Sequence, residues 1–522
     1  MSKKISIVLT IFGVFIVILL TALYFVNFRL SDLVRQRIDE SLDDSWKIEF
    51  DAIDFSLFSM TFDVIGPDVS RRDSTELLWR VSAEKAEVAG IHPLQILFYK
   101  EFIADEVLLE RPEVYVHKIK SDKQKHTKGS TNDLGLVVEK ALIRDGILSF
   151  RNDSVGYLDT SFNLETGKLE FGNQAVDPLK LSESVYLQLS DLSYSNRDST
   201  ELLSILEVTK NRDSELIIDS LSWIPQLSLK DFSDYHGWRK SRTTAKVNRI
   251  EAEMPTMRSD SAYTIGKICI SGADIDLEKD LSYDLPSRET SLPQDILKEL
   301  DLKFSIDSIA FNQSNLAVKL HREKGLVAQL SFKDIQGSAY ATNLPKAKTA
   351  LGFTSKASTL NGSSLEVRSE YYYDTNNPWV LSGSMTDTEL EFFSDFLRKM
   401  AGVEIASGKL NQLKFDMEGN NQINEGTVSF LYDNLSIVAV HKETGKKKVV
   451  LNVLTDVLGA LVFWKQNPTN GNTRIGEFSV ERDPRRAFPS QWIQGLMSGL
   501  LETVAKVDPM KINRNHHKEK RK

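Results

Sequence analysis

Most of the chain alternates apolar and polar residues. Apolar residues recur at every second position much more often than at helical spacing, which is typical of strands with one apolar and one polar face. Near the start of this pattern, Trp46, Ile48 and Phe50 alternate with Lys47 and Glu49. The chain beyond its amino-terminal segment is therefore predicted to be mainly β.

A finer pattern interrupts the alternation. Two apolar residues two positions apart are followed by a step of three and then by further apolar or small residues two apart. In an uninterrupted strand this odd step would turn the later residues to the opposite face, so a bulge or kink at the step keeps one face apolar. The pattern occurs in 48–55, 81–88, 102–109, 141–150, 268–277 and 304–311.

Each such unit predicts a bent strand. Laid side by side, bent strands would form an elongated, curved, taco-like sheet with an apolar groove. A strand, corner and strand of an ordinary closed sandwich explains the spacing equally well, and both interpretations stay open. The residues predicted to line the groove are Phe50, Phe62, Val81, Val107, Leu109, Val114, Ile275, Phe304 and Ile306.

A few segments instead have helical spacing. Amphipathic or short helices are predicted at 30–42, 93–99, 295–300, 388–400 and 492–507. Segment 449–464, apolar nearly throughout, is predicted to be a buried helix or strand pair. The last helix is expected to contact a membrane or close one end of the groove, through Trp492, Ile493, Leu496, Leu500 and Leu501.

The segment from Ile5 to Phe28 carries no charged residue. A helix of this length reaches ~36 Å, more than the ~30 Å of a bilayer core. A cleaved secretory signal is the alternative, but its apolar region is shorter and ends at small residues, whereas this one ends in bulky residues. A retained anchor is therefore predicted, with basic residues on both flanks that leave its orientation open. Its representative apolar positions are Ile5, Ile11, Phe15, Ile18, Leu19, Leu23 and Phe28.

Composition narrows the class of partner. The 522 residues carry a formal net charge of -8, which argues against nucleic acid as the main partner. Cys269 is the sole cysteine, so an intrachain disulfide and cysteine-based metal sites are excluded. Two basic stretches, 118–133 and 511–522, are predicted to be a loop and a tail. The tail is expected either to be solvated or to touch an anionic lipid surface.

The sequence offers no reactive constellation. It lacks the nucleophile-elbow, zinc-protease and dinucleotide-binding motifs, so no catalytic residue, metal site or cofactor is predicted. Asp274, Asp276, Glu278 and Asp280 alternate, but the glycine of a calcium loop is missing and the spacing is that of one strand face. A solvated strand face is the favoured interpretation. The chain is not predicted to be an enzyme.

The order of these elements resembles the AsmA-like family of Gram-negative envelope proteins, relatives of TamB and, more remotely, of chorein-type bridge-like lipid transfer proteins. The resemblance lies in the apolar amino-terminal segment followed by 46–64, and in 81–118, which has a strand, a short Pro-Leu helix, and a strand that ends in Arg111-Pro112. Segments 406–417, 426–438 and 474–483 of the carboxyl region also resemble the family in their pattern.

This resemblance implies an inner-membrane, single-pass protein with most of its chain in the periplasm and a long β-groove that holds or moves phospholipid. It supplies no catalytic residues. The expected parts are an anchor (1–28), a groove (29–387), a carboxyl-terminal β module (388–510) and a tail (511–522). The alternative is a non-catalytic periplasmic scaffold or assembly factor for outer-membrane components, built from closed sandwiches and bound to other envelope proteins.

Overall fold

The computed structural model describes residues 46–56, 59–73, 76–92, 101–118, 135–171, 184–212, 215–253, 256–257, 263–299, 304–340, 350–359, 362–373, 376–445 and 463–505. Several predicted segments lie wholly or mostly outside these residues: the anchor, the helices at 30–42 and 93–99, the loop at 118–133, the apolar segment 449–464 and the tail. The described part is mainly β, as predicted.

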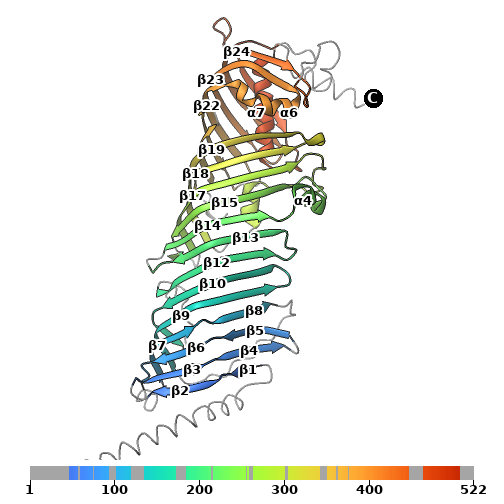
Figure 1. Ribbon diagram of the computed structural model, residues 1–522. Coiled ribbons are helices and arrows are strands. Elements are labelled where there is room, and N and C mark those ends of the chain that lie inside the picture. Colours follow the sequence, from blue (N-terminus) through green and yellow to red (C-terminus); the bar gives the residue numbers. More distant parts are fainter. Residues whose placement is uncertain are drawn as a thin grey trace, which may run out of the picture. The chain divides into compact units, whose positions relative to one another are not determined.

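Contacts divide the chain into two compact units, residues 1–219 and 220–522. The division falls within a strand, and the predicted change of module at 387/388 lies inside the second unit. Figure 1 traces the strands of each unit. The first contains β1 (Trp46–Glu49), β2 (Ala52–Ser56), β3 (Thr61–Ile65), β4 (Asp68–Asp73), β5 (Glu76–Ser82), β6 (Lys85–Ala89), β7 (Glu101–Glu110), β8 (Glu113–Lys118), β9 (Gly135–Asn152), β10 (Gly156–Thr166), β11 (Leu169–Phe171), β12 (Tyr186–Asn196), β13 (Glu201–Lys210) and the start of β14 (Glu215–Pro225).

In the first unit, consecutive short strands act as two halves of one bent strand. β1 pairs with β4 while β2 pairs with β3, and β5 and β6 in turn pair with β8 and β7. Both β7 and β8 then lie parallel to successive halves of the long strand β9. Strands β10, β12 and β13 continue the open sheet in antiparallel order.

The predicted bends are confirmed at four of the six steps. Breaks between strands fall at 50–51 and 83–84, and left-handed residues fall at Asp145 (φ 53°) in β9 and Gly272 (φ 65°) in β17. The prediction is wrong for 304–311, because β18 runs through that step and shifts register only beyond Phe311, where Gln313 has a φ of 48°. Strand β7 likewise continues through its step.

The second unit combines long strands with four described α-helices. Strands β17 and β18 are parallel, and the other strand pairs described here for this unit are antiparallel. Its elements are α4 (Leu229–His236), β15 (Ser241–Glu253), β16 (Thr256–Met257), β17 (Tyr263–Asp280), α5 (Pro293–Glu299), β18 (Phe304–His321), η1 (Glu323–Gly325), β19 (Val327–Tyr340), β20 (Leu351–Thr359), β21 (Ser364–Tyr371), β22 (Trp379–Glu389), η2 (Leu390–Phe393), α6 (Ser394–Ala401), β23 (Val403–Gly419), β24 (Ile423–Ala439), β25 (Ile475–Glu481) and α7 (Pro489–Val504).

The fully packed core lies at the carboxyl-terminal end of the second unit. Buried residues of β21 to β25 form one cluster, with Trp379, Leu410, Val428 and Tyr432 all at most 2% exposed. Helix α7 covers this part of the sheet. The helices predicted at 295–300, 388–400 and 492–507 correspond to α5, to η2 with α6, and to α7; α4 was not predicted.

Candidate functional site

Apolar side chains of the first unit line up across the strands. Hydrogen-bonded neighbours place them in four rows, each perpendicular to the strands. Because the bends restore the alternation after each odd step, the four rows share one face, which we call the apolar face. The rows are Trp46, Arg71, Trp79, Val116, Phe150, Leu158, Tyr194 and Leu203; Ile48, Val69, Val81, Val114, Leu148 and Thr160; Ile53, Val64, Ala86, Leu109, Ile143, Leu164, Leu187 and Lys210; and Phe55, Phe62, Val88, Val107, Ala141 and Thr166.

Five of the predicted groove residues therefore lie on this face. Phe62 and Val107 share one row, Val81 and Val114 another, and Leu109 a third. All five are half-buried. Phe50, at the break between β1 and β2, is 8% exposed. These residues of β3, β5, β7 and β8, which the sequence pattern predicted to share one face, therefore do so in the structure.

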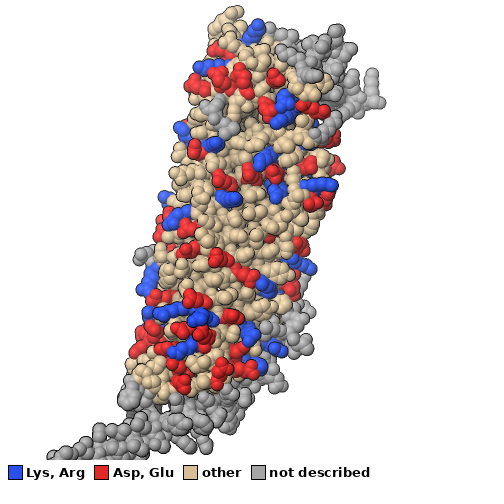
Figure 2. All heavy atoms as spheres, in the orientation of Figure 1, with Lys and Arg blue, Asp and Glu red and all other residues tan. Residues whose placement is uncertain are grey.

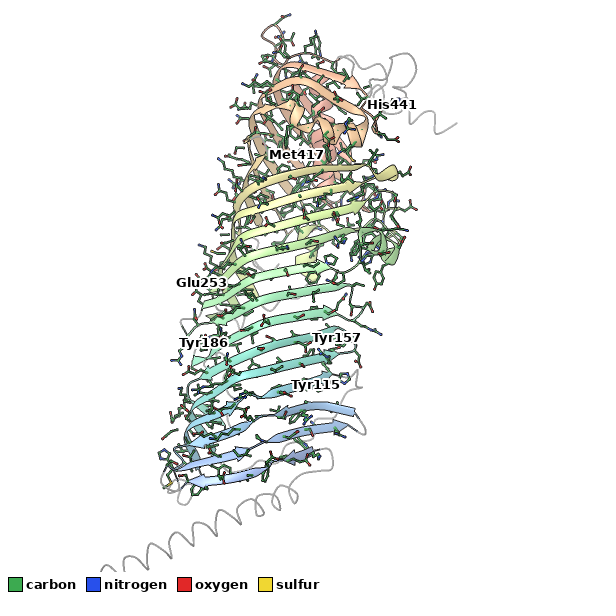
Figure 3. The ribbon with its side chains drawn as sticks, viewed as in Figure 1. Tyr115, Tyr157, Tyr186, Glu253, Met417 and His441 are labelled. Carbon is green, nitrogen blue, oxygen red and sulfur yellow. The ribbon has the colours of Figure 1, made fainter. Side chains whose placement is uncertain are left out.

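The opposite face of the same strands carries paired charges, together with the buried Ala104, Val138 and Leu142 where β7 pairs with β9. Lys85 lies 3.0 Å from Asp63 and 2.8 Å from Glu87, and Lys140 lies 3.3 Å from Glu165. Figure 2 shows acidic and basic side chains interspersed over the face in view. In Figure 3, Tyr157 marks the start of β10; it is 39% exposed, while its neighbour Leu158 belongs to the apolar face. The ion pairs and the four apolar rows thus lie on opposite faces of this sheet.

Two cationic side chains also lie on the apolar face. Lys210 closes the Leu109 row; it is 6% exposed and donates hydrogen bonds to the carbonyls of Val185 (2.7 Å) and Asn211 (3.0 Å). Burial lowers the pKa of Lys210. In the first row, the guanidinium of Arg71 lies 5.5 Å from the ring centre of Trp46, which contacts Trp79 edge to face. Carbonyl oxygens satisfy Lys210, whereas Arg71 lies over an aromatic ring and its Nε is buried without a hydrogen-bond partner among the described residues.

In the second unit, Ile275 continues the same kind of row. It pairs with Ala245 on one side and Leu316 on the other, and Leu316 pairs with Phe332. Ile306 pairs with Ile265, and Phe304 with Tyr263. Because β18 does not bend between Ile306 and Ile309, alternation puts Ile306 on the face opposite to Ile309 and Leu316. The prediction that Ile306 lines the same apolar face as Ile275 is therefore wrong. Ile275 and Ile306 are half-buried.

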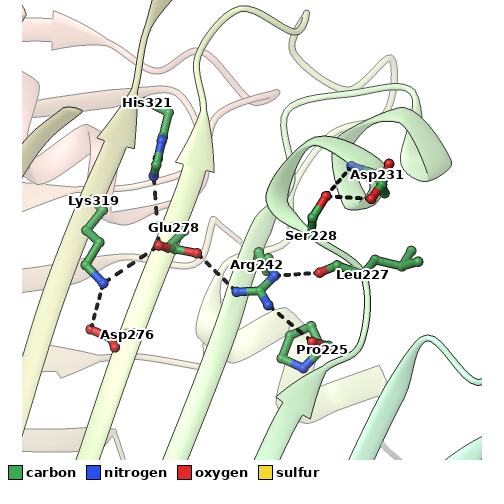
Figure 4. A network of polar contacts seen from close by, with 9 residues as sticks. All are labelled: Pro225, Leu227, Ser228, Asp231, Arg242, Asp276, Glu278, Lys319 and His321. Atoms are coloured by element: carbon green, nitrogen blue, oxygen red, sulfur yellow. Dashed lines mark hydrogen bonds and ion pairs between the residues drawn. The ribbon is translucent and has the colours of Figure 1, made fainter. Parts of the chain in front are cut away.

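Acids of the second unit's polar face are paired with neighbouring strands, as Figure 4 shows. Glu278 accepts a 3.1 Å hydrogen bond from Arg242 and lies 3.7 Å from Lys319, which is 3.6 Å from Asp276. Arg242 also donates to the carbonyls of Leu227 (3.0 Å) and Pro225 (3.2 Å), which ties the chain before α4 to the sheet. These contacts engage carboxylates that a calcium site would need, and the described residues contain no cluster of three metal-binding side chains.

Helix α7 presents to the sheet a seam of small residues rather than its large ones. A Cβ on Gly499 would lie 2.4 Å from Val428, and one on Gly476 of β25 would lie 2.0 Å from the Gly499 carbonyl oxygen. Trp492, Leu496 and Leu500, which were predicted to contact a membrane or close the groove, pack against the core cluster from the flanks of this seam. Leu501 is half-buried, and Ile493 is 62% exposed.

Sequence reasoning missed the inward-facing cations Lys210 and Lys279. The alternation contains the signal, because Lys210 comes two positions after Val208 and Lys279 two positions after Leu277, where the pattern calls for an apolar residue. It also missed α4, whose signal is the cap pair Ser228 and Gly237: the Ser228 hydroxyl accepts from the Asp231 N–H, and Gly237 has a φ of 70°.

Comparisons with protein-family models and with curated proteins find no match for this chain. Within the described residues, no helix has the length and apolar character needed to cross a bilayer. The predicted anchor lies outside those residues.

Proposed function

We propose that this chain is a membrane-anchored envelope protein that binds lipid acyl chains along the apolar face of its bent strands. It would act in phospholipid transport or outer-membrane homeostasis, as the resemblance to AsmA-like proteins implies. The observation that carries the proposal is the set of four apolar rows, half-buried on one side of a sheet whose other side is ion-paired.

The burial of the two units supports this interpretation. Apolar residues at the carboxyl-terminal end of the second unit form a packed cluster beneath α7. In the described part of the first unit, only a few are buried, namely Phe50, Ile53, Ala104, Val138, Leu142 and Ile205. An apolar surface of this extent is costly in water, at ~25 cal/mol per Å². A cover of hydrocarbon removes that cost.

Acyl chains suit such a surface energetically. Each methylene that leaves water for apolar surroundings gains ~0.8 kcal/mol, so a lipid leaves a bilayer readily only where every methylene stays covered. The rows of mainly apolar residues provide that cover, and strand pairing satisfies the backbone polar groups beneath them. The site therefore needs no catalytic residue.

Purification without detergent tests the proposal. The chain from residue 29 onward, isolated from cells, should carry phospholipid that mass spectrometry detects. Val107→Asp, on the apolar face, should lower the lipid content severalfold. Ile147→Asp is the matched control, because Ile147 lies on the other face and is 49% exposed; this variant should retain its lipid. A folded but lipid-free protein would refute the proposal and leave the scaffold function.

A further inference from the structure

Lys279 is a charged residue at the end of an apolar row in the second unit. Strand alternation puts Ile275, Leu277 and Lys279 on one face of β17, so this row of apolar residues ends in an ammonium group. Its pairing partners, Ser241 and Leu320, carry no charge. The side chain is half-buried, and among the described residues no carboxylate forms an ion pair with it. It differs in this from Lys210, which carbonyl oxygens satisfy.

Two arginines approach this lysine, one of them through strand pairing: Arg239 stands two residues before Ser241, the pairing partner of Lys279. Arg239 precedes β15 and is fixed by donating to the carbonyls of Leu281 (2.7 Å) and Tyr283 (3.0 Å). Arg486 follows β25, and its carbonyl accepts a 2.5 Å hydrogen bond from Thr290. Burial lowers the pKa of Lys279, and the positive charges of Arg239 and Arg486 lower it further.

The connection between the parallel strands β17 and β18 holds this cluster together. Residues 281–284 hold Arg239, and Thr290 holds Arg486. Farther along, Leu292 is 1% exposed and Gln294 is 0% exposed, and the Gln294 amide donates to the carbonyl of Asn377 (3.2 Å). A packed segment therefore fixes the Arg239 side chain and the backbone carbonyl of Arg486.

Acidic groups near the cluster act on the arginines. Asp280 and Asp284 act on Arg239, and Asp483 lies 3.4 Å from Arg486. None of them forms an ion pair with the Lys279 ammonium within 4.0 Å. A half-buried ammonium near other cations is costly unless an anion joins it. Phosphate oxygens, which accept charge-assisted hydrogen bonds from Lys and Arg, are suited to that position.

We propose that Lys279, with Arg239 and Arg486, binds the phosphate of an anionic lipid headgroup whose acyl chains lie along Leu277 and Ile275. This inference rests on the proposed function, to which it adds a headgroup subsite. The shared ligand chemistry is a phosphate anion, and its source is either a lipid or free inorganic phosphate.

Two lipids with identical photoreactive acyl chains separate these possibilities. The full chain, in phosphatidylcholine vesicles, is offered equal amounts of phosphatidic acid and diacylglycerol, and the two adducts are quantified after illumination. The wild type should favour phosphatidic acid, and Lys279→Met should lower that preference about tenfold, which is the effect of losing one charge-assisted hydrogen bond. Lys279→Arg should restore it.

Lys267→Met is the matched control. Lys267 lies on the same strand and is exposed, so this variant removes the same charge and should leave the preference unchanged. Circular dichroism checks that each variant folds. Equal labelling by both lipids in the wild type would overturn the headgroup inference and leave acyl-chain binding intact, whereas labelling by neither would overturn both. Inorganic phosphate that binds in a Lys279-dependent way, measured by phosphorus NMR without any lipid preference, would assign the cluster to the free ion and also overturn the inference.

Discussion

Individual residues set the bends of the long strands. Several left-handed positions are occupied by Asp or Asn rather than Gly, among them Asp145, Asp191, Asp334 and Asn434, all with φ near 50°. Short polar side chains tolerate this conformation best after glycine. Asn163 of the neighbouring strand accepts the Asp145 N–H at 2.8 Å, which satisfies a donor that the bulge removes from the ladder.

A β-branched residue at such a bend should be costly. Asp145→Val is expected to lower the free energy of unfolding by about 1–2 kcal/mol, because valine resists a positive φ. Asp145→Gly should be neutral or stabilising. Denaturant unfolding followed by circular dichroism measures both. The control is Asp54→Val in β2, an exposed strand residue where valine is favoured; equal losses at 54 and 145 would contradict the assigned role of the bend.

Lys279 gives a pH dependence of known sign. Its pKa is lower in the folded chain than its ordinary value of 10.5, so the folded state binds this proton less well than the unfolded state. The loss of folding stability caused by the protonated Lys279 is complete below the pKa of the folded state. It vanishes as the pH rises past the pKa of the unfolded state. Without anionic ligands, Lys279→Met should therefore stabilise the chain at neutral pH, and the gain should shrink toward pH 10.5. A gain that grows with pH would contradict this placement of the lysine.

At the scale of elements, the odd step in the alternation predicted bent strands because a bulge has a direct sequence signature. The prediction misplaced the bend of β18, because it used the step between Ile306 and Ile309 instead of the odd step from Phe311 to Leu316, in which Gln313 lies. Helix α7 was predicted from the same kind of periodicity, but large apolar residues do not make its closest contact. Gly495 and Gly499 do, because the absence of side chains lets the helix backbone approach Phe478 and Val428. Periodicity alone does not show whether large residues or glycines of a helix make its closest contact with the sheet.

A side chain added at Gly499 should weaken the packing of α7 on the sheet. Gly499→Val places atoms where Val428 and Phe478 already lie, and is expected to lower the free energy of unfolding by about 1–3 kcal/mol. Met497→Ala, on the same helix at a 41% exposed position, should change it little. Thermal unfolding compares the two variants. If Gly499→Val were tolerated as well as Met497→Ala, the close packing described for α7 would be wrong.

At the scale of the whole molecule, the mainly β class and the placement of Phe62, Val81, Val107, Leu109 and Val114 on one face were predictable from alternation. The parallel pairing of β7 and β8 with β9 was not, because residues distant in sequence meet there without a local signal. Nor could periodicity distinguish apolar rows that pack into a core, as in β22 to β24, from rows that stay half-buried, as in β5 to β9.

The most direct measurement compares the two faces of the same strands. A photoreactive residue is placed in the full chain, in cells, at Val114 or Leu158 on the apolar face, and at Tyr115 or Tyr157, their neighbours on the other face. After illumination, mass spectrometry should find lipid adducts at positions 114 and 158 and none at 115 and 157. Adducts absent from all four positions, or equal on both faces, would contradict acyl-chain binding along the apolar face.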